Sequence, residues 1–400
     1  MPARLLEQNV ARLVDSFALS AGGAHVYKCA ADVDLAIWGA AFGDSHKDFE
    51  YHRLIEQTML VGFSFLYLLL FDEQRDPVAL QPLIVVDQDL LVTAAATIKG
   101  AINFVRKFWP CFLRTRMLLA GCLDGDSKPG VIAPANPRRV NGLLAEALCV
   151  CARRQKISLI STKDFPAAMR EELSPFVSAG YTRVGGFPPL VLDLNFTSFD
   201  QYMDIRLSRV TRKSLRRKLR KADTISPPIA FEVLTDCREV IDELYPLYLS
   251  VANRAPLAFE IFSRDFFVEA GERMPGRHRY FVWRRNGKVL AFNFCTIWDG
   301  EIWDNEIGFD YEIAHELNLY YRTFRDVVVW ALRSGLRRYH CGPFNYDPKL
   351  HLRLRPVPVD LYVWHRSKII NALIRRIAPL FAPAKSDPAL RNYFRIHTSA

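Results

Sequence analysis

Two carboxylates stand two positions apart in the segment EIWDNEIGF, which spans residues 301–309. Alternate side chains of a β-strand point to the same face of the sheet, so we expect Asp304 and Glu306 to share one face. Partial burial and mutual repulsion would raise the pKa of one of them towards the range of a general base. The alternative is a pair of carboxylates at a sheet edge that bind nearby arginines.

Two loops in the same half of the chain carry further candidates. Arg254 and Glu260 lie in the irregular stretch NRAPLAFEIF, and Tyr346 and Lys349 lie in GPFNYDPK, after a predicted strand. Loops next to regular elements often carry binding residues. We expect these residues to bind substrate and to line one cleft with the two strand carboxylates. The alternatives are surface polar residues and a proline-rich connection.

Metal and serine-hydrolase chemistry are not indicated. The nine histidines are scattered, and neither a cluster with metal-ligand spacing nor a GxSxG motif occurs. The eight cysteines form no CxxC pair, and several lie in apolar runs such as AEALCVCA. We therefore predict no metal cofactor, and we expect buried free thiols.

Positive charge is concentrated in RLSRVTRKSLRRKLRKA. Nine Lys or Arg occupy the sixteen positions from Arg206 to Lys221, with no carboxylate among them, in a chain of net charge +10. Such cations repel one another and form no i,i+4 ion pairs, which favours an anionic partner over a solvated helix face. CoA phosphates, a tRNA backbone and an acidic lipid surface all fit. The predicted ligands of this partner are Arg212, Arg216 and Arg217.

A second basic amphipathic segment, RSKIINALIRRIAPLF, lies near the C-terminus. It places five apolar residues opposite three cations, which makes contact with a membrane surface an expectation. The longest uncharged run, residues 57–71, is shorter than the ~20 residues needed to cross a bilayer. The first residues contain charges before any apolar core of signal length, so we expect a cytoplasmic protein with peripheral membrane contact still open.

The length of 400 residues exceeds what one core usually holds, because single cores stop growing near ~250–300 residues. We expect two domains, 1–197 and 198–400. Each half reads as a strand meander followed by a strand, a helix and further strands. The first half has predicted strands at 63–71, 78–86 and 116–121 and helices at 138–156 and 165–180. The second half has a basic helix at 200–222, hairpins at Asn286-Gly287 and Asp299-Gly300, and a helix at 315–335.

Several segments together resemble the FemAB-like and CelD/BcsL-like group of the GNAT acyltransferase superfamily. They are YMDIRLSRVTRKSLRRKLRKA, the hairpin around NGK, GFDYEIAHELNLYY, a helix ending in ALRSG, and CGPFNYDPK. The match runs from about Tyr181 to His365, and the first half is assigned by pattern alone. The resemblance implies a mixed α/β (α+β) fold of two tandem GNAT-like domains, each a mostly antiparallel sheet flanked by helices.

The resemblance also implies roles for particular residues. GNAT enzymes often place a tyrosine near the leaving sulfur, which makes Tyr320 or Tyr321 the expected acid; His315 is the alternative, and both tyrosines could simply be core residues. In one respect the chain departs from the group. The stretch GFDYEIAHELN carries one glycine and several carboxylates where acetyl-CoA users have a glycine-rich loop that holds pyrophosphate.

These observations lead to one functional expectation and two alternatives. The expected activity is N-acylation of an amine on a small-molecule or lipid-linked acceptor of cell-envelope or polysaccharide metabolism, with acyl-CoA or acetyl-CoA as donor. A FemAB-type transferase would instead use aminoacyl-tRNA to extend a peptidoglycan precursor. A non-catalytic module would use the basic helix to bind nucleic acid or a membrane.

Overall fold

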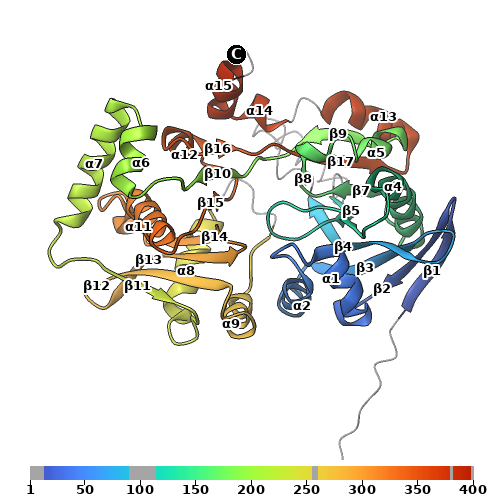
Figure 1. Cartoon of the computed structure of the whole chain (residues 1–400), viewed down its shortest axis with the longest axis horizontal. Helices are drawn as coiled ribbons and strands as arrows, with labels where there is room; N and C mark the ends of the chain where they lie inside the picture. Colours follow the sequence, from blue (N-terminus) through green and yellow to red (C-terminus); the bar gives the residue numbers. More distant parts are fainter. Residues whose placement is uncertain (1–12, 90–113, 255–259, 379–381, 398–400) are drawn as a thin grey trace, which may run out of the picture. The chain divides into compact units, whose positions relative to one another are not determined.

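The computed structural model describes residues 13–89, 114–254, 260–378 and 382–397, and the chain forms two compact units (Figure 1). Unit 1 comprises Met1–Gly185 and Val359–Leu380, and unit 2 comprises Gly186–Pro358 and Phe381–Ala400. The predicted division at 197/198 assigned the last strand to the second domain. In the structure this strand pairs with strands of unit 1, a partnership that its apolar sequence does not specify.

Unit 1 is built on one mixed sheet with helices on both faces. The strand order is β1-β2-β3-β4-β5-β7-β17-β8, with β6 beside β4 and β9 beside β17, and β5 and β7 run parallel. The strands are β1 (Leu13–Leu19), β2 (Gly22–Tyr27), β3 (Phe63–Phe71), β4 (Pro77–Asp89), β5 (Arg114–Ala120), β6 (Gly130–Val131), β7 (Leu159–Thr162), β8 (Phe165–Pro166), β9 (Thr182–Gly185) and β17 (Val359–His365).

The apolar run in β3 explains why both faces of this sheet are covered. Leu68 packs in the core with Leu144 of α4, whereas Tyr67 and Leu69 pack on the other face with Trp38 of α1. A strand that is apolar on both faces needs cover on both sides. The helical elements of unit 1 are η1 (Ala30–Asp32), α1 (Leu35–Phe42), α2 (Phe49–Thr58), α4 (Pro137–Arg154), η2 (Ala167–Met169), α5 (Ser174–Ser178) and α13 (Lys368–Ile377).

Unit 2 contains a second mixed sheet, with strand order β11-β12-β13-β14-β15-β10-β16. Its strands are β10 (Leu190–Asp193), β11 (Ala230–Leu234), β12 (His278–Arg285), β13 (Lys288–Trp298), β14 (Glu301–Phe309), β15 (Arg338–Cys341) and β16 (Arg355–Pro356). Both predicted hairpins are confirmed: Asn286-Gly287 and Asp299-Gly300 have positive φ angles and join β12 to β13 and β13 to β14.

Helices cover both faces of the sheet of unit 2 (Figure 1). Leu215 of α7 and Phe324 of α11 belong to the core on one face. On the other face, Phe267 of α9 contacts the rings of Phe292 and Phe294 in β13. The helices of unit 2 are α6 (Phe199–Arg206), α7 (Arg209–Asp223), α8 (Ile241–Ala252), α9 (Arg264–Arg273), α10 (Tyr311–Ala314), α11 (Leu319–Arg333), α12 (Tyr346–His351), α14 (Pro383–Ser386) and α15 (Pro388–His397).

The predicted basic helix 200–222 is two helices instead of one. Leu207 is extended, with φ −95° and ψ 141°, and Ser208 accepts a hydrogen bond from the Thr211 amide as the N-cap of α7. A serine in this position favours a new helix start. The break changes the apolar stripe: Leu215 remains buried, whereas Val210 is 80% exposed.

The helix predicted at 165–180 is also interrupted. Residues 165–166 form β8, a 3-10 turn follows, and α5 begins only at Ser174. Pro166 and Pro175 explain the difference, because proline has no amide proton for a helix interior and restricts the residue before it. Gly180, predicted to end the helix, follows α5 with φ +92°.

The cysteines were expected to be buried free thiols. The described cysteines are free; Cys29 is half-buried and the others are buried, namely Cys122, Cys149, Cys151, Cys237, Cys295 and Cys341. Cys111 lies outside the described residues.

In the part of the chain that the structure describes, no helix has the length and apolar character needed to span a bilayer.

A buried ion cluster in unit 1 lies just after the parallel strands β5 and β7. The Lys47 ammonium is buried and donates hydrogen bonds to the carbonyl oxygens of Asp124 and Asp126, each at 2.5 Å. Asp164 belongs to the same cluster and accepts a hydrogen bond from the Ser127 amide on its backbone oxygen at 3.2 Å. Burial raises the pKa of Asp164 to about 6, although Lys163 and Lys47 oppose the shift.

This raised pKa predicts that Asp164 destabilises the fold at neutral pH. Between the unfolded and folded pKa values the native state binds more protons, so the free energy of unfolding falls as pH rises through that window. Asp164→Asn removes the titration and suits the positive φ at this position. The variant should gain up to about 3 kcal/mol over the natural protein between about pH 4 and pH 7, measured by urea unfolding.

The exposed carboxylate Asp44, which pairs with Lys128 at 2.6 Å, provides the control. Asp44→Asn should show no comparable gain with pH. If the difference between Asp164→Asn and the natural protein is the same at every pH, the raised pKa is wrong.

Candidate active site

Two parallel strands separate in the middle of the unit 2 sheet. β14 pairs with β15 from Glu301 opposite Arg338 to Asp304 opposite Cys341, and the pairing ends there. β14 continues to Phe309 and stays paired with β13. Among the described strands, none pairs with the other edge of β14 beyond Asp304. The backbone groups of such an edge can bind an extended ligand.

A β-bulge in β14 lies at the point of separation. Cys295 pairs with Asp304 and Phe294 pairs with Glu306, so Asn305 is an extra residue in β14. Residues that pair directly share a face, which places Asp304 on the face of Cys295 and Glu306 on the face of Phe294. The prediction that the two carboxylates share a face was therefore wrong, because a bulge shifts the alternation by one residue.

Asp304 is buried, with 8% of its surface exposed, and it joins three strands. Its carboxylate accepts hydrogen bonds from Asn293 Nδ2 in β13 at 2.9 and 2.8 Å and from the Tyr339 hydroxyl in β15 at 2.7 Å. The Cys295 thiol lies 3.5 Å away. Burial raises the pKa of Asp304, although these hydrogen bonds oppose the shift.

Two other predicted residues lie close enough to Asp304 to interact with it. Lys349 donates hydrogen bonds to the carbonyl oxygens of Gly342 and Pro343, at 2.8 and 3.3 Å, and its charge acts on Asp304. Burial, together with the charges of Cys341 and Asp304, raises the pKa of the Tyr320 hydroxyl well above its usual value. Tyr320 and Lys349 thus lie within electrostatic range of Asp304, where β14 and β15 separate.

The remaining candidates from these segments have different surroundings. Tyr346 is buried, and its hydroxyl donates to the Pro188 carbonyl oxygen at 3.1 Å. The ring of Tyr321 makes an edge contact with Tyr320 and lies 3.7 Å from the Lys218 ammonium of α7. His315 is exposed between α10 and α11. Tyr346 therefore belongs to the core, and Tyr321 joins the basic helix to the first turn of α11.

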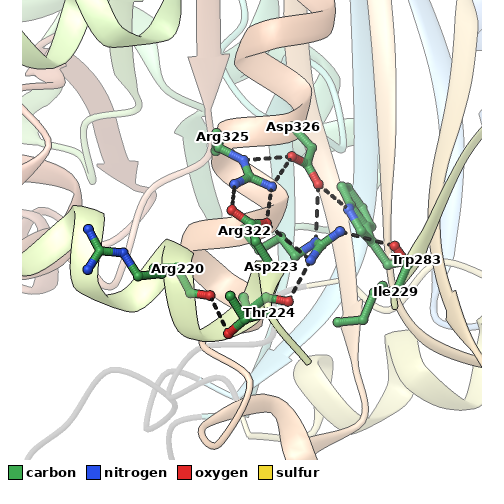
Figure 2. A network of polar contacts seen from close by, with 9 residues as sticks. Arg220, Asp223, Thr224, Ile229, Trp283, Arg322, Arg325 and Asp326 are labelled. Carbon is green, nitrogen blue, oxygen red and sulfur yellow. Dashed lines mark hydrogen bonds and ion pairs between the residues drawn. The ribbon is translucent and has the colours of Figure 1, made fainter. Parts of the chain in front are cut away.

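A polar network anchors the end of α7 against α11 and β12 (Figure 2). Arg322 donates to the carbonyl oxygens of Ala222 and Ile229, at 2.8 and 3.0 Å. Arg325 binds the Asp223 carboxylate through two nitrogens, at 2.6 and 2.9 Å. A cation at the C-terminus of a helix is favourable because carbonyl oxygens remain there without helical partners.

The network also reaches the sheet (Figure 2). Asp326 accepts hydrogen bonds from Trp283 Nε1 of β12 and from Arg325 Nε, each at 2.8 Å. Its carboxylate lies 3.5 Å from Arg322 Nε. Bidentate arginine contacts fix geometry better than single ion pairs. The network therefore holds α7 in place, so that Lys218 stays beside the first turn of α11.

Glu306 lies on the opposite face of the sheet, near α8. Its charge and that of Glu260 both contribute, after burial, to raising the pKa of the Tyr248 hydroxyl. Tyr248 accepts a hydrogen bond from the Phe262 amide at 2.8 Å. This grouping connects β14 to the predicted acceptor loop, of which residues 255–259 lie outside the described residues.

Arg254 lies in an open hollow of about 360 Å³ at the end of β14. Its guanidinium is 4.1 Å from the Tyr311 ring centroid and donates to the Ser250 carbonyl oxygen at 3.1 Å. The hollow is lined by Leu247, Ser250, Arg254, Phe309, Asp310, Tyr311 and Glu312. Asp304, Glu306 and Tyr346 are not among these lining residues, so the expected common cleft is not confirmed.

The segment between β14 and α11 is acidic and partly helical. Asp310 caps α10 through the Glu312 amide at 3.1 Å and binds the Lys288 ammonium at 2.7 Å. Asn318 adopts a left-handed conformation before α11 begins. A carboxylate occupies the capping position, and carboxylates repel phosphate. This segment lacks the glycine-rich geometry that the resemblance associates with pyrophosphate.

The predicted anion ligands of the basic helix differ in their partners. Arg212 and Arg216 lie 3.1 and 3.2 Å from the Asp204 carboxylate of α6. Arg217 is exposed, in a row with Arg209 and Lys213 at i,i+4 spacing. Among the described residues, no carboxylate forms an ion pair with this row. The predicted helix therefore offers an exposed basic stripe next to a neutralised pair.

Sequence reasoning missed three site residues. Asn293 is a lone amide in the apolar strand VLAFNFCTIW, and a buried amide requires hydrogen-bond partners, so its type was a usable signal. Tyr339 alternates with Cys341 in RRYHC, but nothing there indicates a carboxylate partner. Tyr248 lies in an apolar helix whose sequence does not distinguish a site tyrosine from a core tyrosine.

The Asp304 network predicts a difference between two substitutions at one position. Asp304→Ala leaves Asn293 and Tyr339 without their buried acceptor and should lower the free energy of unfolding by about 2–4 kcal/mol. Asp304→Asn should cost about 1 kcal/mol, because Asn293 Oδ1 has no hydrogen-bond partner and a rotated Asn293 amide can accept from the new amide. Urea unfolding measures both.

Tyr339→Phe is the matched control, since it removes one donor and leaves Asn293 on Asp304. It should cost about 1 kcal/mol. Equal losses for Asp304→Ala and Asp304→Asn would show that the network does not stabilise the fold.

A family model for an acetyltransferase (GNAT) domain matches residues 209–349, from the first residue of α7 to Lys349. No curated protein matches the chain in sequence. Among solved structures, FemX is similar over 79% of this chain and 92% of its own, with 10% identity and a TM-score of 0.50.

Two other structures are similar at lower TM-scores. L-PGS from Bacillus licheniformis covers 82% of this chain and 96% of its own, with 13% identity and a TM-score of 0.49. A tandem GNAT protein from the clavulanic acid biosynthesis pathway covers 79% and 89%, with 11% identity and a TM-score of 0.46. The expected tandem GNAT-like fold is confirmed. Residues 209–349 thus match the acetyltransferase (GNAT) domain family, and the chain has a fold similar to that of FemX.

Proposed function

We propose that this acyltransferase N-acylates an amine of a cell-envelope or polysaccharide-related acceptor, at the point where β14 and β15 separate. The observation that supports it is the edge of β14 beyond Asp304, which no described strand pairs with. Tyr320 and Lys349 lie near Asp304 at one side of this edge, and Glu306 lies on the opposite face. The choice of acceptor class follows the FemAB-like group.

The edge of β14 is suited to an acyl thioester such as acyl-CoA. Backbone amides on this edge beyond Glu306 can donate hydrogen bonds to the amide groups and to the thioester carbonyl oxygen of an extended donor, as in strand addition. Donors fixed at a developing oxyanion lower the barrier to acyl transfer. Lys218, held beside Tyr321, supplies a cation for the donor's phosphates.

Glu306 is the residue best placed to act as base. It shares the Tyr248 face with Glu260, next to the predicted acceptor loop, whereas Asp304 is enclosed by three donors. Glu306 takes the proton of the amine as nitrogen bonds to the acyl carbon and the carbon–sulfur bond breaks. Tyr320, which stays protonated because its pKa is raised, donates a hydrogen bond to the leaving thiolate. Tyr321 is the alternative donor.

A second candidate function is supported by the exposed stripe of α7. Arg209, Lys213 and Arg217 follow one another at i,i+4 spacing, and Arg220 and Lys221 continue the stripe. A row of cations this long matches a nucleic-acid backbone better than one pyrophosphate. The acidic segment after β14 points the same way, since it disfavours a phosphate at that position. Aminoacyl-tRNA is therefore the alternative donor.

Substitution of the two carboxylates tests the acyltransferase proposal. Glu306→Gln should lower kcat about 100-fold, because one general base is lost while the shape is kept. Asp304→Asn is the matched control and should lower kcat less than about 10-fold. The measurement is thiol release from acetyl-CoA and longer acyl-CoA donors with a panel of amino sugars and amino-acid amides.

The same assay across pH adds a second readout. The natural protein should lose activity at low pH, where the base is protonated, and Glu306→Gln should lose this limb. If Glu306→Gln retains near-normal turnover and the acidic limb, Glu306 is not the base and Glu260 becomes the candidate.

The choice of donor is tested on α7. Replacement of Arg209, Lys213 and Arg217 by Gln should weaken tRNA binding and reduce the salt dependence of the affinity by about three units of slope if tRNA is the donor. The control is Arg212→Ala with Arg216→Ala, whose side chains bind Asp204. Gel-shift titration with tRNA and native mass spectrometry with CoA are the measurements. CoA binding without tRNA binding would exclude the second candidate.

A further inference from the structure

Helix α13 of unit 1 is amphipathic, and its apolar face is exposed. Ile369, Ile370, Leu373 and Ile377 are 83, 43, 54 and 38% exposed. None of the residues of α13 is buried. Soluble proteins usually turn the apolar stripe of a helix toward their core, so this helix is oriented in an unusual way.

Asn371 fixes this orientation. Its Oδ1 accepts a hydrogen bond from the His365 amide at 3.0 Å, and its Nδ2 donates to the Gly180 carbonyl oxygen at 2.9 Å. Both partners belong to the body of unit 1. At about 100° per residue, Ile369, Leu373 and Ile377 lie well away from Asn371 around the helix. Asn371 therefore faces the protein, and the apolar stripe faces outward.

The charge around the stripe has one sign. Lys368, Arg375 and Arg376 of α13 are exposed, and Arg366 precedes the helix. The sequence from 361 to 386 contains no Asp or Glu. Cations beside an exposed apolar stripe are typical of helices that lie in the interface of an anionic bilayer.

We propose that α13 docks unit 1 on an anionic phospholipid bilayer, with Ile369, Leu373 and Ile377 inserted among the acyl chains and the cations on lipid phosphates. A second copy of the chain is a poorer occupant. A twofold interface through this helix would bring the two sets of cations together without any acid in the segment to neutralise them. This docking does not depend on the acyl donor or acceptor.

The test is co-sedimentation of the full chain with vesicles. We expect binding to vesicles of equal parts phosphatidylglycerol and phosphatidylcholine, little binding to phosphatidylcholine alone, and weakening as salt rises. Ile369→Gln with Leu373→Gln should weaken binding on the order of 10-fold or more. Replacement of Lys368, Arg375 and Arg376 by Gln should weaken it about fivefold for each cation.

Leu60→Gln with Val61→Gln is the matched control, because these residues are 72 and 91% exposed in the same unit and the sequence from 54 to 74 contains no Lys or Arg. This pair should bind vesicles like the natural protein. Absence of binding to the anionic vesicles, or equal effects of the control and α13 pairs, would overturn the proposal. A dimer in analytical ultracentrifugation that the α13 pair dissociates, without vesicle binding, would assign the face to a second copy.

Discussion

The separation of β14 from β15 after Asp304 and Cys341 is the constraint on which the unit 2 site depends. Unpaired backbone groups are costly inside a protein. Two parallel strands therefore separate only where other contacts hold the last paired residues in place. Asp304 does this by accepting hydrogen bonds from Asn293 of β13 and Tyr339 of β15. The bulge at Asn305 then reverses the alternation, so that Glu306 faces α8. Asp304 thus holds the point in β14 beyond which Glu306 is directed to the opposite face of the sheet.

The basic helix depends on this sheet through a different set of contacts. Arg322 and Arg325 of α11 hold Ala222 and Asp223 at the end of α7, and Asp326 connects α11 to Trp283 of β12 (Figure 2). Arg322 is buried, and the bidentate contact of Arg325 with Asp223 fixes the relative geometry of the two helices. The cations of α7 therefore keep a fixed position relative to the first turn of α11, where Lys218 contacts Tyr321. Helix α11 thus links the proposed donor-binding cations of α7 to Tyr320 and Tyr321.

Local sequence patterns predicted most helices and strands, but they did not predict which distant segments pair with one another. Local patterns predicted the hairpins at Asn286-Gly287 and Asp299-Gly300, because positive φ angles favour these residues. The bulge at Asn305 has no such signature, and the assumption of regular alternation misplaced Glu306. Asp204 lies two residues before Arg206, so a charge count that began at Arg206 missed the partner of Arg212 and Arg216. The return of β17 to unit 1 involves a pairing between distant segments that local pattern cannot fix.

Each unit contains two neighbouring parallel strands whose pairing ends within the sheet, but the contacts beyond that point differ between the units. In unit 1, β5 and β7 are parallel and their pairing ends at Ala120 opposite Thr162. The loop that follows is closed by its own contacts: Lys47 donates to the carbonyl oxygens of Asp124 and Asp126, and the Ser127 amide donates to Asp164. An extended donor beyond β5 and β7 would have to displace the buried Lys47 ammonium, which would leave polar groups unpaired. Little room therefore remains there for such a donor. In unit 2 the corresponding edge of β14 has no described strand partner, which supports the proposal that acyl transfer takes place in unit 2.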